Sequence, residues 1–261
     1  MNLLAFCFRF LSVIAILLGI NSSLALEAPK DSRQSSYQLM SLENQAMQDD
    51  PNLNPALFWV MDGHSLWKEK TGKKNVSCAS CHGDSGQKMA GVATQFPKVQ
   101  KGKLQTLEGQ INQCRTSNQE ASPLAYESKE LLALTTFVAT QSKGLPIAVQ
   151  ETPQNRIDLQ QGRQFFNERM GQLNLSCAQC HQDRAGLKLG GSLIPQGHPT
   201  AYPIYRIEWQ TMGSLQRRLR NCMSGVRAKQ FEYGSTEMAQ LELFLMWRAR
   251  GMPLETPGVR P

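Results

Sequence analysis

A five-residue pattern, Cys-X-X-Cys-His, occurs twice in this chain of 261 residues and limits its fold more than any other feature. In this attachment signal for c-type haem, two thiols bracket a turn and add to the two vinyl groups of one porphyrin, and the next imidazole reaches the iron. A single copy can arise by accident or as half of a zinc site. Two copies in matching contexts predict two covalently bound haem c groups. Their attachment residues would be Cys78 and Cys81, then Cys177 and Cys180, with His82 and His181 as axial ligands of the iron.

The similarity between the two copies extends beyond the motif. Residues 63–78 lie over residues 162–177 at a constant offset of 99 residues. A second stretch, residues 128–146, lies over residues 235–253 at an offset of 107, so the second copy carries a net insertion. The Gly/Pro-rich run from Gly190 to Pro203 is the expected place for this insertion. A chain with this internal repeat is predicted to contain two related domains in tandem.

Each repeat is predicted to form a helix, the haem motif, loops and a last helix. Asn54-Pro55 marks a helix start, and residues 130–141 and 237–250 carry apolar side chains at helical intervals before a Lys/Arg-Gly stop. We predict an all-α fold of two tandem class I cytochrome c domains, each wrapped around one covalently bound haem. The expected boundaries are 1–25 for a signal peptide, 26–148 for the first domain and 149–261 for the second, with a linker at 143–153.

The N-terminal segment is predicted to be a secretory signal peptide. It is apolar from Leu11 to Ile20 and ends in small residues, so cleavage is expected near Ala25; an uncleaved membrane anchor is the alternative. Because haem is attached to this motif outside the bacterial cytoplasm, the mature protein is expected in the periplasm. No later segment is predicted to span a membrane. Loss of Arg9 with the signal lowers the net charge from +7 to +6. This diffuse basic balance fits acidic partners or anionic substrates, and no pattern indicates nucleic acid.

Two cysteines outside the haem motifs occupy corresponding places in the repeat. Cys114 follows His82 by 32 residues, and Cys222 follows His181 by 41, so each lies where a small cytochrome c offers its second axial ligand. The usual ligand is methionine, and Met89 and Met212 lie in roughly suitable regions, but the repeat pairs neither with a second methionine. A Cys114–Cys222 disulfide is a further alternative in an oxidising compartment. The favoured interpretation is a thiolate on each iron, which would lower both reduction potentials.

The two cysteine sites differ four residues upstream. Gln110 precedes Cys114, whereas Arg218 precedes Cys222. If this segment is helical, positions four apart share a face, and the guanidinium would lie beside the sulfur. Such a group suits a tetrahedral oxyanion such as sulfate or thiosulfate. Arg217, Arg220 and Arg227 add charge nearby, and a solvated basic helix face is the alternative for all four arginines.

These features together resemble the SoxA family. SoxA is the dihaem subunit of the SoxAX cytochrome of bacterial sulfur oxidation, and the resemblance covers essentially the whole mature chain. Its most specific part is Arg218-Leu-Arg-Asn-Cys222, followed by Met-Ser-Gly. The resemblance implies that Cys114 is the distal ligand of the first haem. It also implies that Cys222, the distal ligand of the second haem, carries an extra sulfur as a cysteine persulfide, and that Arg218 binds the anionic substrate.

The activity implied by the resemblance is that of an L-cysteine S-thiosulfotransferase. Such an enzyme joins thiosulfate oxidatively to a cysteine thiol of the SoxYZ carrier protein, and electrons pass to a SoxX-type monohaem cytochrome c, the partner in a heterodimer. Two alternatives remain open. One is a dihaem electron-transfer cytochrome without chemistry of its own, and the other is a thiosulfate dehydrogenase that forms tetrathionate. His64 and His198 receive no role.

Overall fold

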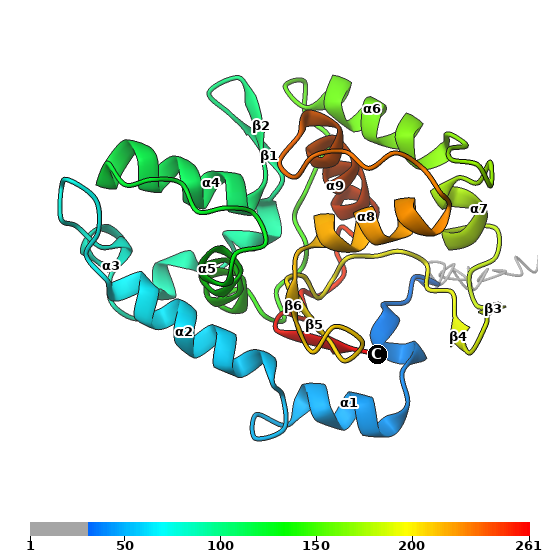
Figure 1. The fold of residues 1–261 in the computed structure, drawn as a ribbon, viewed down its shortest axis with the longest axis horizontal. Coiled ribbons are helices and arrows are strands. Elements are labelled where there is room, and N and C mark those ends of the chain that lie inside the picture. The colour runs from blue at the N-terminus through cyan, green and yellow to red at the C-terminus, as the bar shows by residue number, and fades with distance from the viewer. Residues whose placement is uncertain (1–30) are drawn as a thin grey trace, which may run out of the picture. The chain divides into compact units, whose positions relative to one another are not determined.

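Four helices occur in the same order in each repeat of the sequence (Figure 1). The first repeat contains α2 (Ala56–Lys68), α3 (Cys78–His82), α4 (Leu107–Cys114) and α5 (Lys129–Thr140). The second contains α6 (Arg156–Asn167), α7 (Cys177–His181), α8 (Leu215–Gly225) and α9 (Thr236–Arg248). The computed structural model describes residues 31–261, so the predicted signal peptide lies outside the described residues. Residues Arg33–Pro261 form one compact unit, and the predicted boundary at 148/149 within it stays a prediction.

Most of these helices begin at a serine or threonine that the sequence supplies in both repeats. The side chain of each such residue accepts a hydrogen bond from a backbone N–H in the first helical turn, which satisfies a donor that the helix itself leaves free. The capping residues are Ser77, Thr106, Ser128, Ser176, Ser214 and Ser235. The two last helices are thus confirmed, with bounds that differ by one or two residues from those expected. The segment that carries Arg218 and Cys222 is also helical.

The first and last helices of each repeat cross at a glycine. A Cβ atom added to Gly63 on α2 would lie 2.1 Å from the carbonyl oxygen of Ala133 on α5. In the second repeat, a Cβ atom on Gly162 of α6 would lie 2.0 Å from the carbonyl oxygen of Gln240 on α9. Both distances are shorter than any allowed contact, so only glycine permits this crossing. The same helix pair is therefore built twice, by residues that the sequence repeat aligns.

The prediction of an all-α fold is not confirmed, because short strands lie between the helices. Hairpins are formed by β1 (Lys98–Gln100) with β2 (Lys103–Gln105) and by β3 (Lys188–Leu189) with β4 (Ser192–Leu193). A three-stranded sheet has the order β6-β5-β7, with bounds Thr211–Gly213, Ile204–Arg206 and Gly258–Arg260. The extra length of the second repeat falls between α7 and α8, where β3 and β4 form an additional hairpin.

The remaining regular elements are short. They are η1 (Ser36–Leu39), α1 (Leu42–Asp49), η2 (Gln87–Met89), η3 (Ala93–Gln95) and the π-helical turn η4 (Arg115–Gln119). Helix α1 packs beside β7, and Asn54 donates from its side chain to the carbonyl of Pro257 at 3.1 Å. The start of the described chain and its end are thus held together.

The predicted linker pairs with the equivalent segment at the end of the second repeat. Gly144 N–H donates to the carbonyl of Leu254 at 2.7 Å, and Gly251 N–H donates to the carbonyl of Ile147 at 2.8 Å. Because Gly251 and Leu254 are the repeat equivalents of Gly144 and Ile147, the two bonds are related by a local two-fold axis. Ile147 and Val149 are 2% and 3% exposed, so these two side chains of an otherwise exposed segment reach the packed interior.

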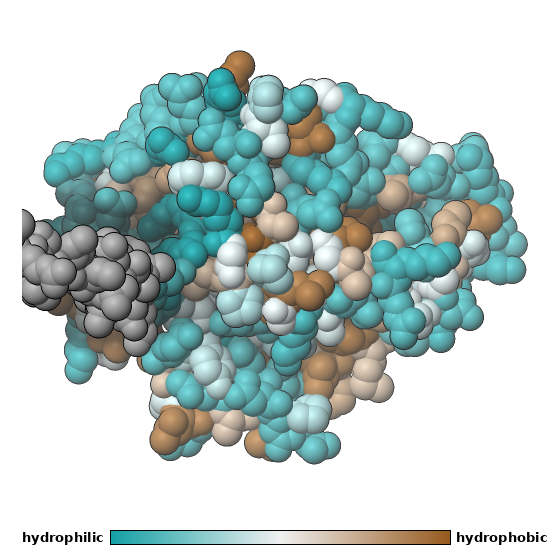
Figure 2. Space-filling view, turned by 180° about the vertical axis from the view of Figure 1, so that it is seen from behind, coloured by the Kyte–Doolittle hydropathy of each residue, from teal (hydrophilic) through white to brown (hydrophobic). Residues whose placement is uncertain are grey.

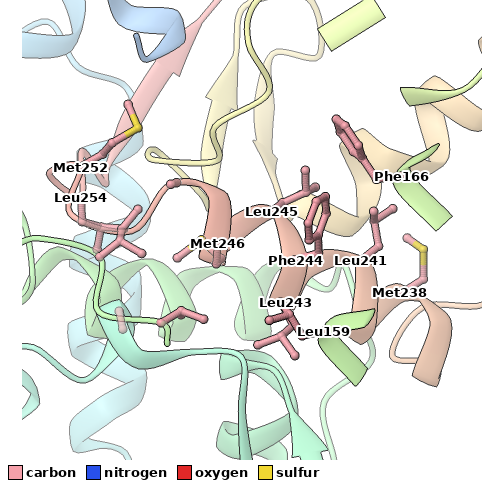
Figure 3. Close-up of a cluster of buried hydrophobic side chains, with 14 of the residues drawn as sticks. Leu159, Phe166, Met238, Leu241, Leu243, Phe244, Leu245, Met246, Met252 and Leu254 are labelled. Carbon is pink, nitrogen blue, oxygen red and sulfur yellow. The ribbon is translucent and has the colours of Figure 1, made fainter. Parts of the chain in front are cut away.

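The larger apolar core belongs mainly to the second repeat. Leu241, Leu243 and Phe244 of α9 pack with Leu159 and Phe166 of α6 in this core (Figure 3). On the face seen in Figure 2, hydrophilic residues dominate and hydrophobic ones are scattered between them. No helix within residues 31–261 is long and apolar enough to cross a membrane.

Candidate functional site

The first Cys-X-X-Cys-His motif lies on α3 at the wall of an apolar cavity of about 250 Å³. Cys78, Cys81 and His82 line this cavity together with Cys114 from α4. The other lining side chains are largely apolar and include Trp67, Val92, Phe96, Leu107, Ile111, Leu134 and Val138. The structure therefore brings together all four residues that the sequence assigned to the first haem.

Trp67 holds the segment that follows His82. Its indole Nε1 donates to the carbonyl of Gly83 at 2.8 Å, and its ring lies 5.6 Å from the His82 imidazole, centroid to centroid. Burial raises the pKa of the Cys78 thiol, because the charged thiolate is poorly solvated in this cavity. A buried, neutral thiol beside an apolar cavity is consistent with a cysteine that forms a thioether bond to haem.

Gln110 and Cys114 lie one turn apart on α4. The Gln110 side chain donates from Nε2 to the sulfur of Cys114 at 3.4 Å. The π-helical turn η4 starts directly after this cysteine and carries Gln119, whose amide also lies 4.0 Å from the sulfur of Cys78. Hydrogen bonds to a ligating sulfur are one of the means by which a protein tunes a metal site.

The second motif, on α7, has a histidine with a fixed orientation. His181 Nδ1 lies 2.8 Å from the carbonyl oxygen of Pro195. Because a carbonyl only accepts, Nδ1 carries the proton, and the lone pair of Nε2 is left for a metal. Burial lowers the pKa of His181, the bond to Pro195 opposes this shift, and the guanidinium groups of Arg218 and Arg248 lower it further. A neutral imidazole is the form that binds iron.

Gly197 lets the chain pass close over this imidazole. Its φ of +73° is in the left-handed region, and a Cβ atom there would lie 3.2 Å from Cγ of His181. Pro195 and Gly197 both belong to the Gly/Pro-rich run that the sequence identified only as an insertion. Their relation to His181 depends on contacts between distant residues, and no local pattern indicated it.

Helix α8 places Arg218 and Cys222 one turn apart, as predicted. Charges on both residues influence the pKa of Tyr202, and Arg218 also influences His181. Burial raises the pKa of the Cys177 thiol to about 11, and the nearby Cys222 contributes to this rise. Arg218 and Cys222 thus lie close enough to the second haem motif for their charges to act on His181 and Cys177.

The side chains of the other two arginines of α8 contact aromatic rings and backbone carbonyls away from Cys222. Arg217 stacks over the ring of Trp209 at 4.4 Å, and Arg220 stacks over Tyr233 at 4.5 Å and donates to the carbonyl of Phe231. Arg227 lies beyond the helix and is exposed. Across residues 31–261, the guanidinium of Arg218 has no hydrogen bond, ion pair or aromatic ring as a partner. Of the four arginines considered from the sequence, Arg218 is therefore the one placed to bind a ligand near Cys222.

Arg248, on α9, was not anticipated from the sequence. It stacks over Phe166 at 4.5 Å, donates to the carbonyl of Gln196 at 3.3 Å and lines a cavity of about 430 Å³ beside His181. The repeat places Gln141, the residue directly after α5, at the equivalent position. A comparison of the two repeats could have revealed this difference, since it parallels the exchange of Gln110 for Arg218.

The structure also bears on the alternatives for the second axial ligand. All six described cysteines are free, so the Cys114–Cys222 disulfide is not formed. Met212 lies on β6 and is 0% exposed in a core cluster with Ala56 and Leu132, whereas Met89 does line the first cavity. His64 stacks on Phe137 at 5.1 Å, which gives it a packing role, and His198 lines the cavity beside His181.

The donor sets of both repeats fit haem c. Each combines two thiols one helical turn apart, a histidine directly after them and a cysteine on a separate helix. In the first repeat an apolar cavity joins these groups, and in the second the hydrogen bond to Pro195 prepares Nε2 of His181 for a metal. The residues Cys78, Cys81, His82 and Cys114 would hold one group, and Cys177, Cys180, His181 and Cys222 would hold the other.

Comparisons with known proteins identify the family of this chain. The family model described as "SoxA/TsdA, cytochrome c domain" matches residues 62–147 and 161–254. The L-cysteine S-thiosulfotransferase subunit SoxA of Pseudaminobacter salicylatoxidans is 32% identical over 235 residues, which cover 89% of this chain and 82% of that protein. The same subunit of Allochromatium vinosum is 34% identical over 208 residues, or 77% and 72% of the two chains. The crystal structure of SoxXA from P. pantotrophus matches with a TM-score of 0.85 at 29% identity, over 88% of this chain and 87% of that one.

Proposed function

The chain belongs to the SoxA family of c-type cytochromes, and from this membership we propose that it is an L-cysteine S-thiosulfotransferase subunit acting in the periplasm with two haem c groups. Its substrates would be thiosulfate and a cysteine thiol of a SoxYZ-type carrier protein. A SoxX-type monohaem cytochrome c would be its heterodimer partner and electron acceptor. The observation that carries the proposal is the position of Arg218, which has no other described partner and lies one turn before Cys222.

The proposed reaction joins two sulfur atoms by oxidation. A carrier thiol and thiosulfate become a carrier–S–S–SO₃⁻ group, with release of one proton to solvent and of two electrons, which pass one at a time to the monohaem partner cytochrome. When bound, haem supplies one-electron transfer and iron ligation at each site. Everything else must come from residues of the chain, which bind the anion, orient it and hold the reactive sulfur.

Arg218 is proposed to bind the sulfonate end of thiosulfate. A guanidinium offers parallel N–H donors to a tetrahedral oxyanion, and its charge persists at any physiological pH. With the sulfonate held there, the terminal sulfur of thiosulfate would face the sulfur of Cys222, since the two side chains share one face of α8. We further propose that Cys222 carries an additional sulfur as a persulfide, which is the partner for sulfur exchange.

The experiment that tests this function measures conjugation of thiosulfate to a carrier thiol, with an oxidised cytochrome c as acceptor. Arg218→Gln, which installs the amide of the first repeat, is expected to lower kcat/KM by at least about 100-fold, since a charge-assisted pair of hydrogen bonds contributes about 3 kcal/mol or more. Arg227→Gln is the matched control, because it removes the same charge from an exposed position. Equal activity of the two variants would exclude the assignment.

The two alternative functions predict different products. A plain electron carrier would show no consumption of thiosulfate, and a tetrathionate-forming dehydrogenase would consume it without a carrier. Identification of the product by mass spectrometry therefore separates the three functions in one assay.

A further inference from the structure

Cys114 lines two cavities rather than one. One is the apolar cavity lined by the first haem motif, and the other is a polar cavity of about 290 Å³. Gln100, Gln110 and Asn118 also line both cavities, so the two cavities adjoin at α4 and the turn that follows it. Cys114 therefore lies where an apolar cavity and a polar cavity meet.

The polar cavity is cationic and rich in hydrogen-bond donors. Lys101 and Lys103, from the β1–β2 hairpin, are its charged lining residues, and no carboxylate lines it. Amide and hydroxyl groups from α4, η4 and the hairpin provide the rest of the wall, among them Gln113 and Ser117. Neither lysine forms an ion pair with a carboxylate in the part of the chain that the structure describes.

The equivalent hairpin of the second repeat is arranged differently. There, Arg206 on β5 is paired with Glu208 at 2.6 Å and stacks over Trp209 at 5.4 Å, so its charge is compensated. Positive charge near Cys222 comes from Arg218 on the helix instead. The two repeats thus place free positive charge beside the cysteine from different elements, the hairpin in the first and helix α8 in the second.

We propose that the polar cavity binds a small tetrahedral oxyanion, such as sulfate or thiosulfate, beside Cys114. Lys101 and Lys103 supply the charge that balances a divalent anion, and the amide of Gln110 separates the anion from the sulfur. The hairpin positions the lysines, since Gln100 and Lys103 are paired across it and β2 packs against α4. The proposal depends on the proposed function only for the choice of ligand class, and it assigns no turnover to Cys114.

The test is a calorimetric titration of the holoprotein with sodium sulfate at low ionic strength. Wild type is expected to bind two sulfates, one in each repeat. The double variant Lys101→Gln/Lys103→Gln is expected to bind the sulfate of the first repeat at least about tenfold more weakly, because charge-assisted hydrogen bonds are lost. Arg218→Gln is expected to lose the sulfate of the second repeat and to keep the sulfate of the first repeat.

A matched control is Lys73→Gln/Lys88→Gln, which removes the same charge from exposed positions outside the cavity. If this control weakens sulfate binding as much as the hairpin variant does, the effect is diffuse charge and the proposal is wrong. Wild-type affinity in the hairpin variant, with an unchanged haem spectrum and Tm, would also overturn it. A failure of the proposed function is distinguishable, because it appears as unaltered conjugation in Arg218→Gln and leaves the part of the sulfate titration that depends on Lys101 and Lys103 unaffected.

Discussion

Gln110 donates a hydrogen bond to the sulfur of Cys114, and Arg218 stands at the equivalent place before Cys222. One amide and one guanidinium, each a helical turn before a cysteine, thus distinguish two otherwise matching sites. The amide can stabilise a sulfur ligand but cannot attract a divalent anion strongly. The guanidinium can do both, and this difference underlies the assignment of the chemistry to the second repeat.

The hydrogen bond from Gln110 should tune the first haem. Loss of this bond in Gln110→Leu makes the sulfur a stronger donor to ferric iron, so the reduction potential should fall. A bond of about 0.5–1.5 kcal/mol corresponds to a fall of about 20–60 mV for one electron. Spectroelectrochemical titration measures it, with Gln113→Leu as the control from an exposed position of the same helix. An unchanged reduction potential in Gln110→Leu would show that this hydrogen bond does not influence the iron.

The contact between Gly197 and His181 should hold the imidazole of His181 in the orientation that the second haem requires. Gly197→Ala adds a Cβ atom 3.2 Å from Cγ of the imidazole, at a backbone φ of +73°. Gly190→Ala introduces similar backbone strain, with φ of +60°, but no atom lies within 4 Å of the added Cβ. Both variants should lose about 1 kcal/mol of stability from backbone strain. Only Gly197→Ala should alter the low-spin ferric spectrum, and identical spectra would exclude a role in holding His181.

The glycines at the two helix crossings should tolerate substitution less than any other position of the helix pairs. Gly63→Ala or Gly162→Ala forces the helices apart and should cost about 1–3 kcal/mol or more, as overpacking does. Gly191→Ala is the control, because its added Cβ meets nothing within 4 Å and its φ is not positive. Thermal unfolding of the three holoproteins measures the effect. A Tm of Gly162→Ala equal to that of the control would contradict the described crossing of α6 and α9.

A buried pair of carboxylic acids should make stability depend on pH. Glu108 on α4 and Glu242 on α9 are 9% and 5% exposed, and burial raises the pKa of both. The charge of Glu108 raises the pKa of Glu242 further, and Glu127 acts on both in the same direction. Because the folded-state pKa lies above the unfolded value, the favourable contribution is complete at acidic pH and is lost as pH rises through the folded pKa.

Glu242→Gln removes one of these charges and keeps the shape of the side chain. It should therefore raise stability at pH 8 by about 1–3 kcal/mol relative to its effect at pH 4, where the acid is already neutral. Chemical unfolding at the two pH values measures the difference. Glu232→Gln, at an exposed position, should show no such difference, and equal effects of both variants at both pH values would refute the buried pair.

The sequence was sufficient for features that depend on residue type and spacing. The motifs, the constant offset and the i, i+4 relation of Arg218 and Cys222 predicted the repeat, the family and the four residues lining the first cavity. Features that depend on non-local geometry could not be predicted. Pro195 meets His181 across 14 residues, and Gly144 pairs with Leu254 across 110. The strands were not predicted, because strands of two or three residues are too short to show an alternation of apolar and polar residues in the sequence.

Cys222 is proposed to be the residue that transfers sulfur at the second haem. The most direct measurement is the intact mass of the mature protein purified from the periplasm, with peptide mapping of Cys222. The expected result is two covalent haems and one additional sulfur on Cys222, with none on Cys114. A Cys222 without additional sulfur, in protein that has not been exposed to reductant, would contradict the persulfide, and fewer than two haems would contradict the assignment of both motifs.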